Sequence, residues 1–379
     1  MAKIKQNIII LLILSSLGLH AQQLILGSER MEEIINSIDN KNLAIVGNQT
    51  SLVNNIHLVD TLLSLKQNIV SVFSPEHGFR GTEDAGAKID NEYDGKTGLP
   101  IISLYGKNKK PTSEQLKDID IIIFDIQDVG ARFYTYISTL HYVMEAAGEN
   151  NIKVIVLDRP NPNGHYVDGP ILEKEFKSFV GMHEIPIVHG MTIGEYAKMI
   201  VGEKWIDNSC ELEVINMINY NRNNLYELPI KPSPNLPNSK SINLYPSLCL
   251  FEGTNVSVGR GTDKPFQHFG SPFLKFYSYA FTPKSGPGSK FPKHENKTCN
   301  GRNLETYPYL SSINLGWLIE SFKQTSNKED FFNSFFDKLA GSDKLRTQII
   351  SGLDEKEIKS SWKSGLKEFK KTREKYLLY

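Results

Sequence analysis

The stretch DIIIFDIQDVGAR, residues 120–132, gives the clearest fold signal in the chain. Its first seven residues are dominated by Ile and Phe, which is typical of a strand buried on both faces of a sheet. Comparable short apolar runs stand at 43–46, 69–73, 101–105 and 154–157, and helical patterns lie between the runs at 58–65, 112–117 and 133–147. Buried strands that alternate with helices predict a Rossmann-like, doubly wound α/β domain with a mostly parallel sheet.

The pattern loosens after residue 157. We expect a helix at 192–203, a strand at 211–217 and an irregular segment at 229–246 that is rich in Pro, Asn and Ser. Beyond it we expect a strand around Val256 and Val258 and helices near 315–322, 329–339 and 355–376. We therefore predict a Rossmann-like domain over 22–230 and a smaller C-terminal α+β domain over 231–379. Two domains suit a chain of 379 residues, because single cores rarely grow beyond about 250–300 residues.

Residues 1–21 have the layout of a secretory signal peptide. Lys3 and Lys5 precede the apolar run IIILLIL at 8–14, and the segment ends in Leu-His-Ala at 19–21. The run is shorter than the roughly 20 apolar residues that span a bilayer. A retained membrane anchor or an interfacial helix is the alternative. We expect export across the inner membrane, most plausibly to the periplasm, with no stable anchor after cleavage.

Composition and motifs exclude several classes of protein. The chain has 43 basic and 43 acidic residues, so it lacks the basic excess of a nucleic-acid-binding protein. Three Cys residues without a CxxC pair argue against a disulfide scaffold or a structural zinc site. The sequence contains no GxGxxG after its first strand, no GxxxxGK[ST] and no GxSxG, which disfavours nucleotide binding and a serine hydrolase of the α/β type.

Polar side chains gather where four of the predicted strands end. They include Asn48 after the first strand, Glu76, His77 and Arg80 after the second, Asp125, Gln127, Asp128 and Arg132 after the fourth, and Arg159 after the fifth. In open α/β sheets, ligands bind in the crevice at the carboxyl ends of the strands. Helix caps and turns also use Asn, Asp and Gly. Four such ends together favour a binding site.

Glu76 and His77 are held between a rigid and a flexible residue. Pro75 stiffens the chain before them and Gly78 lets it turn after them. This arrangement suits an acid or base fixed at the end of a strand, although a surface turn would look similar. Glu83, in the following Gly-flanked loop, either supplies a second carboxylate or merely solvates the loop.

A metal site receives little support from the sequence. Asp125 and Asp128 could both bind a divalent cation, but no His cluster or third nearby carboxylate completes a ligand set.

The second domain contributes its own group of charged residues. Glu252, Arg260 and Asp263 stand among glycines that let a ligand approach the backbone. A structural ion pair is the alternative for Glu252. The aromatic residues around this segment suit either the core or a platform for stacking sugars; they are Phe251, Phe266, Phe269 and Phe273.

Six long motifs, in order, resemble the bacterial exo-β-N-acetylmuramidase family, which was long catalogued as a domain of unknown function. They are PEHGFRGTEDAGAKI (75–89), DIQDVGARFYTYISTL (125–140), LDRPNPNG (157–164), PIVHGMTIGEYA (186–197), PSPNLP (232–237) and FEGTNVSVGRGTDKPFQHFG (251–270). The resemblance covers essentially the whole mature chain. It implies a Rossmann-like domain and a smaller domain with the active site in the cleft between them. It also implies a glycoside hydrolase that releases non-reducing-end β-1,4-linked N-acetylmuramic acid from peptidoglycan fragments, without a metal or nucleotide cofactor.

Glycoside cleavage commonly needs two carboxyl groups, one of them protonated. We expect Glu76 to be the general acid, and the second carboxyl to be Glu83, Asp125, Asp128 or Glu252, acting as base, nucleophile or cation stabiliser. The acetamido group of the substrate could also be the nucleophile. The lactyl carboxylate of muramic acid calls for an Arg, for which the choices are Arg80, Arg132, Arg159 and Arg260. Asn48 and Gln127 suit sugar hydroxyls or the acetamido group, and His77 and Asp125 are further candidates for substrate binding.

Two rival functions remain open from the sequence. One is another hydrolase in the same cleft, such as an amidase or esterase acting on cell-wall material. The other is a non-catalytic periplasmic protein that binds sugars or peptidoglycan fragments, because two α/β lobes around a cleft are also the layout of solute-binding proteins.

Overall fold

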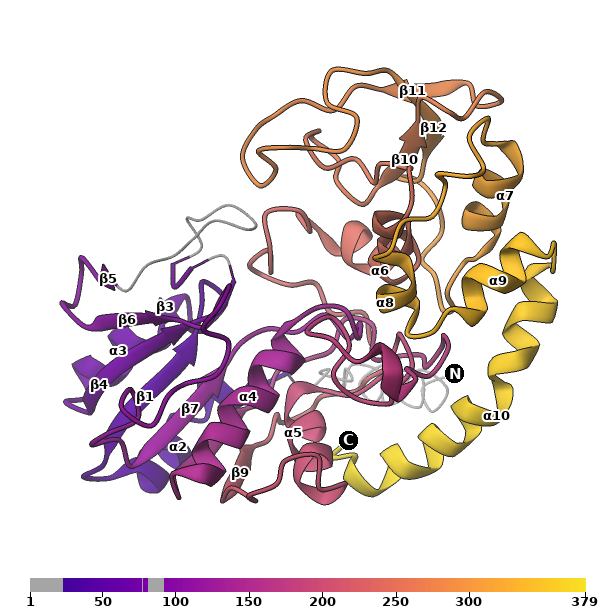
Figure 1. Cartoon of the computed structure of the whole chain (residues 1–379). Coiled ribbons are helices and arrows are strands. Elements are labelled where there is room, and N and C mark those ends of the chain that lie inside the picture. The colour runs from indigo at the N-terminus through magenta and orange to yellow at the C-terminus, as the bar shows by residue number, and fades with distance from the viewer. Residues whose placement is uncertain (1–22, 77, 81–91) are drawn as a thin grey trace, which may run out of the picture.

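The computed structural model describes residues 23–76, 78–80 and 92–379. Figure 1 shows a layered α/β part built from the first half of the chain and a second part above it built from the second half. The predicted signal peptide, residues 1–21, lies outside the described residues. Within them, no helix combines the length and the apolar composition needed to cross a membrane.

A seven-stranded sheet forms the centre of the first part. Its strands are β1 (Asn42–Gly47), β4 (Asn68–Ser74), β5 (Glu92–Tyr93), β6 (Pro100–Ser103), β7 (Ile121–Asp125), β8 (Lys153–Leu157) and β9 (Leu212–Ile215). Their spatial order is β5-β6-β4-β1-β7-β8-β9, and every neighbouring pair is parallel except β5 with β6. The six parallel strands thus follow the order 3-2-1-4-5-6 typical of Rossmann-like sheets, with the reversal between β1 and β7. The predicted fold class is confirmed.

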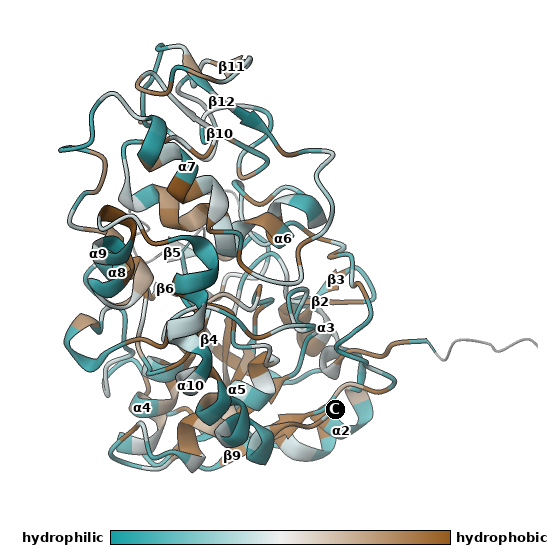
Figure 2. Cartoon of the chain, turned by 90° about the vertical axis from the view of Figure 1, so that its right-hand side faces the viewer, coloured by the Kyte–Doolittle hydropathy of each residue, from teal (hydrophilic) through white to brown (hydrophobic). Residues whose placement is uncertain are grey.

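Helices cover both faces of this sheet, which is why its strands are apolar throughout. The helices of the first part are α2 (Met31–Ile38), α3 (Leu58–Ser64), α4 (Tyr136–Glu149) and α5 (Ile193–Gly202). One core cluster packs α2 and α3 against one face, and a larger cluster on the other face contains α4 and α5 and continues into the second part. Figure 2 shows the sheet strands in the brown of hydrophobic residues between more hydrophilic helices.

The second part begins at α6 (Ser239–Leu248), which continues into the short 3-10 helix η3 (Cys249–Gly253). It holds a three-stranded antiparallel sheet of β10 (His268–Ser271), β12 (Cys299–Asn303) and β11 (Tyr279–Phe281). Its remaining α-helices are α7 (Gly316–Gln324), α8 (Phe336–Ala340), α9 (Lys344–Ile350) and α10 (Glu355–Arg373). The boundary that we predict at residue 230 falls in the irregular segment between β9 and α6.

The end of the chain returns to the first part. Helix α10 runs along the outer edge of the molecule and brings the C-terminus close to α5 (Figure 1). There the Tyr379 hydroxyl donates to Asp158 Oδ2 at 2.8 Å and accepts from the Met217 amide at 2.7 Å. The Leu378 amide donates to Glu195 at 2.9 Å. The two parts are therefore joined at both the connecting segment and the C-terminus.

Three predicted elements differ from the structure, and the segment expected to be irregular at 229–246 is irregular only up to residue 238, because α6 begins at Ser239. Residues 113–118 form only turns, although Thr112 and Gln115 make the reciprocal bonds of a helix cap, and Asp118 adopts a positive φ of 63° that a continuing helix does not allow. Val256 and Val258 flank a single β-bridge, Ser257 with Gly270, and form no strand. Of the helix expected at 329–339, only α8 at its end is α-helical.

Candidate active site

A cavity of about 170 Å³ lies between the carboxyl edge of the central sheet and the second part. The first part lines it with Glu76, the segment Phe133–Tyr136 and Val180. The second part and the connecting segment contribute the remaining lining residues, which are Ser233, Asn235, Leu236, Tyr245, Cys249, Glu252, Arg260, Phe266, Phe335 and Leu339. The cavity therefore brings Glu76 together with Glu252 and Arg260, which follow it by more than 170 positions in the sequence.

Glu76 reaches the cavity because β4 ends two residues before it. Pro75 is buried and Gly78 adopts a positive φ of 78°, so the chain turns sharply around Glu76 at the sheet edge. Tyr105, just beyond the end of the adjacent strand β6, lies near Glu76. Burial, together with the nearby Glu76 carboxyl group, raises the pKa of the Tyr105 phenol to about 12. Tyr105 thus remains a protonated donor beside the partly buried carboxyl group.

Two tyrosines, Tyr134 and Tyr136, form the next part of the wall. They follow β7 and pack edge to face with ring centroids 4.9 Å apart. The Tyr134 hydroxyl donates to the Pro232 carbonyl at 2.9 Å, and the Tyr136 hydroxyl accepts from Asn48 Nδ2 at 3.0 Å. Burial is the main cause that raises the pKa of both phenols, and the charge of Glu76 also raises that of Tyr136. Both groups therefore stay neutral.

Glu252 and Arg260 form a bidentate pair on the opposite side. Arg260 Nε lies 2.6 Å from Glu252 Oε1, and Nη2 lies 3.0 Å from Oε2. Burial alone would raise the pKa of Glu252, but the adjacent Arg260 guanidinium lowers it overall. Glu252 is therefore ionised at neutral pH. Arg260 also lies over the Phe266 ring, 5.1 Å from its centroid.

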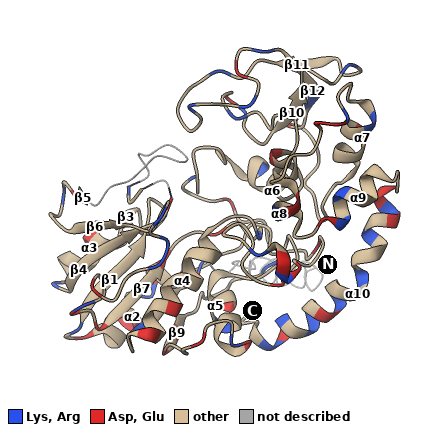
Figure 3. Ribbon diagram, in the orientation of Figure 1, with Lys and Arg blue, Asp and Glu red and all other residues tan. Residues whose placement is uncertain are grey.

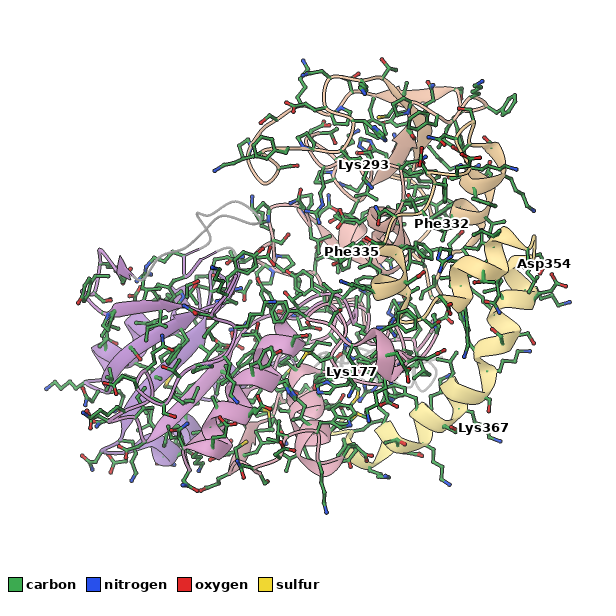
Figure 4. The ribbon with its side chains drawn as sticks, viewed as in Figure 1. Lys177, Lys293, Phe332, Phe335, Asp354 and Lys367 are labelled. Atoms are coloured by element: carbon green, nitrogen blue, oxygen red, sulfur yellow. The ribbon has the colours of Figure 1, made fainter. Side chains whose placement is uncertain are left out.

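Lys293 holds the backbone that carries Glu252. Its ammonium group donates to the carbonyl oxygens of Phe251 at 3.1 Å, Thr254 at 2.5 Å and Val256 at 3.1 Å, which uses all three of its protons. Burial lowers the pKa of Lys293 to about 8, against the opposing effect of Glu252. Figure 4 places Lys293 within the second part. Lys293 itself does not line the cavity, so Arg260 is the cationic side chain that faces it among the described residues.

Three of the four predicted arginines do not line the cavity. Arg159 pairs with Asp125 in the core, with Nε 2.5 Å from Oδ1 and Nη2 2.9 Å from Oδ2. Arg80 is shared between Asp94, at 2.7 Å, and Asp60, at 3.2 Å, beside a separate surface hollow. We correct the expectation for these residues, since their charges are already matched by carboxylates of the fold.

Arg132 is fully buried and joins the two parts of the molecule. Nη1 donates to the carbonyls of Pro170 and Ile185 at 2.8 and 2.6 Å, and Nη2 donates to those of Leu339 and Ala340 at 3.0 and 2.7 Å. Burial lowers the pKa of its guanidinium to about 9. Because four carbonyls occupy these donors, Arg132 is a structural anchor and not the carboxylate partner that we expect from sequence.

Asp128, Gln127 and Asn48 lie behind the cavity wall rather than in it. Asp128 Oδ2 accepts from the Gly130 amide at 2.7 Å, and burial raises the pKa of this carboxyl to about 7. Gln127 Nε2 donates to the carbonyls of Asp128 and Pro160 at 2.8 and 2.7 Å. Asn48 acts on the site only through its bond to Tyr136. These three residues shape the loop on which the tyrosines stand.

The remaining candidates, His77 and Glu83, lie outside the described residues. Among the residues that are described, no group of three or more His, Cys, Asp or Glu side chains is arranged to hold a metal ion. Sequence reasoning missed Tyr134, Tyr136 and Phe335 as wall residues. The aromatic run FYTY at 133–136, directly after the polar end of the fourth predicted strand, was the available signal for the two tyrosines.

Comparisons with known proteins agree with this geometry. Residues 43–240 match the family described as "Exo-beta-N-acetylmuramidase NamZ, N-terminal", and residues 243–379 match "Exo-beta-N-acetylmuramidase NamZ, C-terminal". The chain is 42% identical over 360 residues to the peptidoglycan beta-N-acetylmuramidase NamZ of Bacillus subtilis (strain 168), covering 88% of this chain and 84% of that protein.

Two crystal structures of DUF1343 family proteins from Bacteroides fragilis NCTC 9343 have the same fold. They superpose with TM-scores of 0.88 and 0.81 at 48% and 30% identity, and each match covers 94% of this chain and 99% of the other. With a cavity that gathers Glu76, Glu252 and Arg260 from both parts of the molecule, the chain belongs to the exo-β-N-acetylmuramidase NamZ family of glycoside hydrolases.

Proposed function

We propose that this enzyme removes N-acetylmuramic acid from the non-reducing end of peptidoglycan fragments, with Glu76 and Glu252 as its working carboxyl groups. The observation that carries the proposal is the cavity in which these two residues meet from different parts of the chain. Glycoside hydrolysis needs one carboxyl that donates a proton and one that is ionised, and the two differ here in their surroundings. Glu252 is bonded to a guanidinium, whereas the titratable neighbour of Glu76 is the Tyr105 phenol.

Glu76 is the general acid in this proposal. Tyr105 and Tyr136 lie near it and both phenols stay neutral, so neither neighbour places beside Glu76 a positive charge that would favour its ionised form. As the glycosidic bond lengthens, the leaving oxygen gains negative charge, and Glu76 passes its proton to it. Proton transfer of this kind commonly contributes about 10²- to 10⁴-fold in rate.

Glu252 is the ionised partner. Its pKa is lowered beside Arg260, so it is an anion at neutral pH. An anion there stabilises the positive charge that develops on the sugar ring, and it can orient either a water molecule or the substrate acetamido group for attack at the anomeric carbon. Lys293 holds the backbone on both sides of Glu252 and thereby fixes the position of this side chain in the cavity.

Arg260 supplies selectivity for muramic acid. Of the four arginines that the sequence proposes, it alone lines this cavity among the described residues. Its Nε and Nη2 are bonded to Glu252, whereas Nη1 has no hydrogen-bond partner in the described part of the chain. The free Nη1 suits the lactyl carboxylate that distinguishes N-acetylmuramic acid from N-acetylglucosamine.

The enzyme works outside the cytoplasm in this proposal, as a periplasmic protein. The support is the signal-peptide layout of residues 1–21, with Lys3 and Lys5 before a short apolar run. Fusion of residues 1–25 to a reporter that is active only after export tests this point, and a reporter that stays inactive would contradict it.

Chromogenic β-N-acetylmuramide and the matching β-N-acetylglucosaminide test the function directly. Hydrolysis of the muramide alone supports the proposal. Binding of the muramide without hydrolysis would instead identify a sugar-binding protein, and hydrolysis of both substrates at similar rates would remove the role given to Arg260.

A further inference from the structure

Helix α10 carries a row of unpaired lysines along its outer face. The five residues are Lys356, Lys363, Lys367, Lys370 and Lys371, and all are exposed. At about 100° per residue they fall within an arc of about 100°, and they extend over roughly 22 Å of helix. We call this row the lysine face. Figure 3 shows basic residues recurring along α10 at the edge of the molecule, and Figure 4 labels Lys367 on this outer edge.

The opposite side of the same helix holds the molecule together. Ile358, Trp362 and Phe369 are buried against the protein. The inward-lying Lys359 is 3.0 Å from Glu355 and 3.6 Å from Asp168, and Arg373 donates to the Gly190 carbonyl at 3.0 Å. The basic residues that face inward therefore have partners, whereas none of the five on the lysine face has a hydrogen bond or ion pair within the described residues.

Helix stability does not explain the lysine face. Lys363 and Lys367, and Lys367 and Lys371, are four residues apart, and like charges at this spacing destabilise a helix. The helix dipole favours Lys370 and Lys371 in the last turn but disfavours Lys356 in the first. Glu368 and Glu374 are spaced to offset Lys371 and Lys370, whereas no acid stands three or four residues from Lys356, Lys363 or Lys367.

The charge is concentrated on this segment. Residues 355–379 contain eight basic and four acidic residues, in a chain whose totals are 43 and 43. A row of positive charge on one rigid helix attracts an extended polyanion rather than a single ion. No residue of α10 lines the active-site cavity, so a polymer bound along the lysine face leaves that cavity free.

We infer that the lysine face binds intact peptidoglycan, through the carboxylates that repeat along its stem peptides. The inference rests on the proposed function for the identity of the polymer. An anionic membrane is the less suitable partner, because interfacial helices insert an apolar face and the large apolar side chains of α10 are already buried in the protein. Binding at this face would keep the enzyme on the wall polymer while it trims fragments.

The test is a pelleting assay with purified, peptide-bearing peptidoglycan sacculi. It compares the native chain with a variant in which the five lysines are changed to Gln, a residue of similar helix propensity. The matched control changes five exposed lysines of the first part to Gln and so alters the net charge equally; these are Lys41, Lys66, Lys107, Lys117 and Lys204. Vesicles containing anionic lipid are a parallel arm, and hydrolysis of the soluble chromogenic muramide is measured on every preparation.

We expect the native chain and the control to pellet with sacculi at low salt and to be released as salt is raised. The lysine-face variant should bind at least about tenfold more weakly and hydrolyse the soluble substrate at the native rate. Equal binding by that variant, absence of binding by the native chain, or binding only to the vesicles would each overturn the inference. If the native chain did not hydrolyse the soluble muramide, the proposed function would be overturned instead. Failure of the inference and failure of the proposed function are therefore distinguishable.

Discussion

At the scale of single residues, Arg260 is the group on which recognition of muramic acid rests. Replacing it with Lys keeps the positive charge but loses the planar fork that holds Glu252 at 2.6 and 3.0 Å while leaving Nη1 for the substrate. We expect Arg260→Lys to lower kcat/KM for the chromogenic muramide by about tenfold or more, mainly through KM. The preference for the muramide over the glucosaminide should shrink in parallel.

Arg302→Lys is the control for this prediction. Arg302 pairs with Glu320 at 3.3 Å on the surface, away from the cavity, so the same change there should leave both substrates unaffected. If Arg260→Lys preserved the full preference for the muramide, another group would have to bind the lactyl carboxylate.

The buried carboxyl group of Asp158 should make the stability of the protein depend on pH. It is fully buried, accepts bonds from Gly194, Thr192 and Tyr379, and burial raises its pKa from 3.8 to about 7. The folded state therefore binds the proton more tightly than the unfolded state. Its contribution to stability is complete below pH 3.8 and is lost as the pH rises through 7.

Asp158→Asn removes this dependence. Urea unfolding from pH 4.5 to 7.5 measures the free energy of unfolding of the native chain and of the variant. As the pH rises over this range, the native chain should lose roughly 1–3 kcal/mol relative to the variant. A difference that stays constant over this range would show that Asp158 is already ionised in the folded protein.

At the scale of elements, the loop from Phe251 to Val256 depends on Lys293. The Lys293 ammonium is a shared donor for three carbonyls of this loop, so Lys293→Met leaves them without it. We expect a loss of stability of about 2 kcal/mol and a fall in kcat of at least tenfold, because Glu252 loses its fixed backbone. Lys293→Arg should restore part of the activity.

The pH profile separates this positioning role from simple destabilisation. Since Lys293 and Arg260 both act on Glu252, loss of one positive charge raises the pKa of that carboxyl and moves the acidic limb of kcat/KM to higher pH. Lys297→Met, at an exposed position in the segment that carries Lys293, should shift neither stability nor the profile. If the pH profile of kcat/KM were unchanged in Lys293→Met, Lys293 would have only a structural role and no effect on the charge of Glu252.

The elements of the first part could be predicted because local sequence decides them. The run IIIF at 121–124 can only be a strand covered on both faces, and β1, β4, β6 and β8 follow the same rule. The predictions of a helix at 112–117 and of a strand at 256–258 were wrong, because tertiary contacts override the structure that a short sequence pattern favours. Thr112 forms its cap, but Asp118 adopts a positive φ of 63°, which is incompatible with a continuing helix.

The candidate site was less predictable than the fold. Glu76, Glu252 and Arg260 could be selected by the glycines and prolines around them. The sequence could not show that Arg132, Arg159 and Arg80 are occupied, because their partners lie on distant segments; Arg132, for example, meets the Leu339 and Ala340 carbonyls more than 200 positions away. Tyr134 and Tyr136 resemble core aromatics until the second part is placed opposite them.

At the scale of the whole molecule, the C-terminus fastens the second part to the first. Tyr379 bonds to Asp158 and Met217, and its carbonyl oxygen accepts from Arg222 at 2.8 Å. Tyr379→Phe deprives the buried Asp158 of one donor and should lower the free energy of unfolding by about 1–2 kcal/mol. KM should not change, because this contact is remote from the cavity lining.

Tyr376→Phe provides a comparison at a more exposed contact with Glu203, where the loss should be smaller. Thermal unfolding of both variants tests whether Tyr379→Phe loses more stability than Tyr376→Phe. A Tyr379→Phe variant as stable as the native chain would show that the C-terminal contact does not fasten the two parts.

The central claim is that both parts of the molecule build one pocket in which Glu76 gives its proton to the departing sugar. Glu76→Gln tests it when kcat is measured on two substrates, a nitrophenyl β-N-acetylmuramide and the disaccharide of N-acetylmuramic acid with N-acetylglucosamine. A nitrophenol leaves with little help from an acid, whereas a sugar hydroxyl needs a proton. We predict a loss of about 10²- to 10⁴-fold on the disaccharide and a much smaller loss on the nitrophenyl substrate. Equal losses on both substrates, or near-native turnover of the disaccharide, would contradict the account.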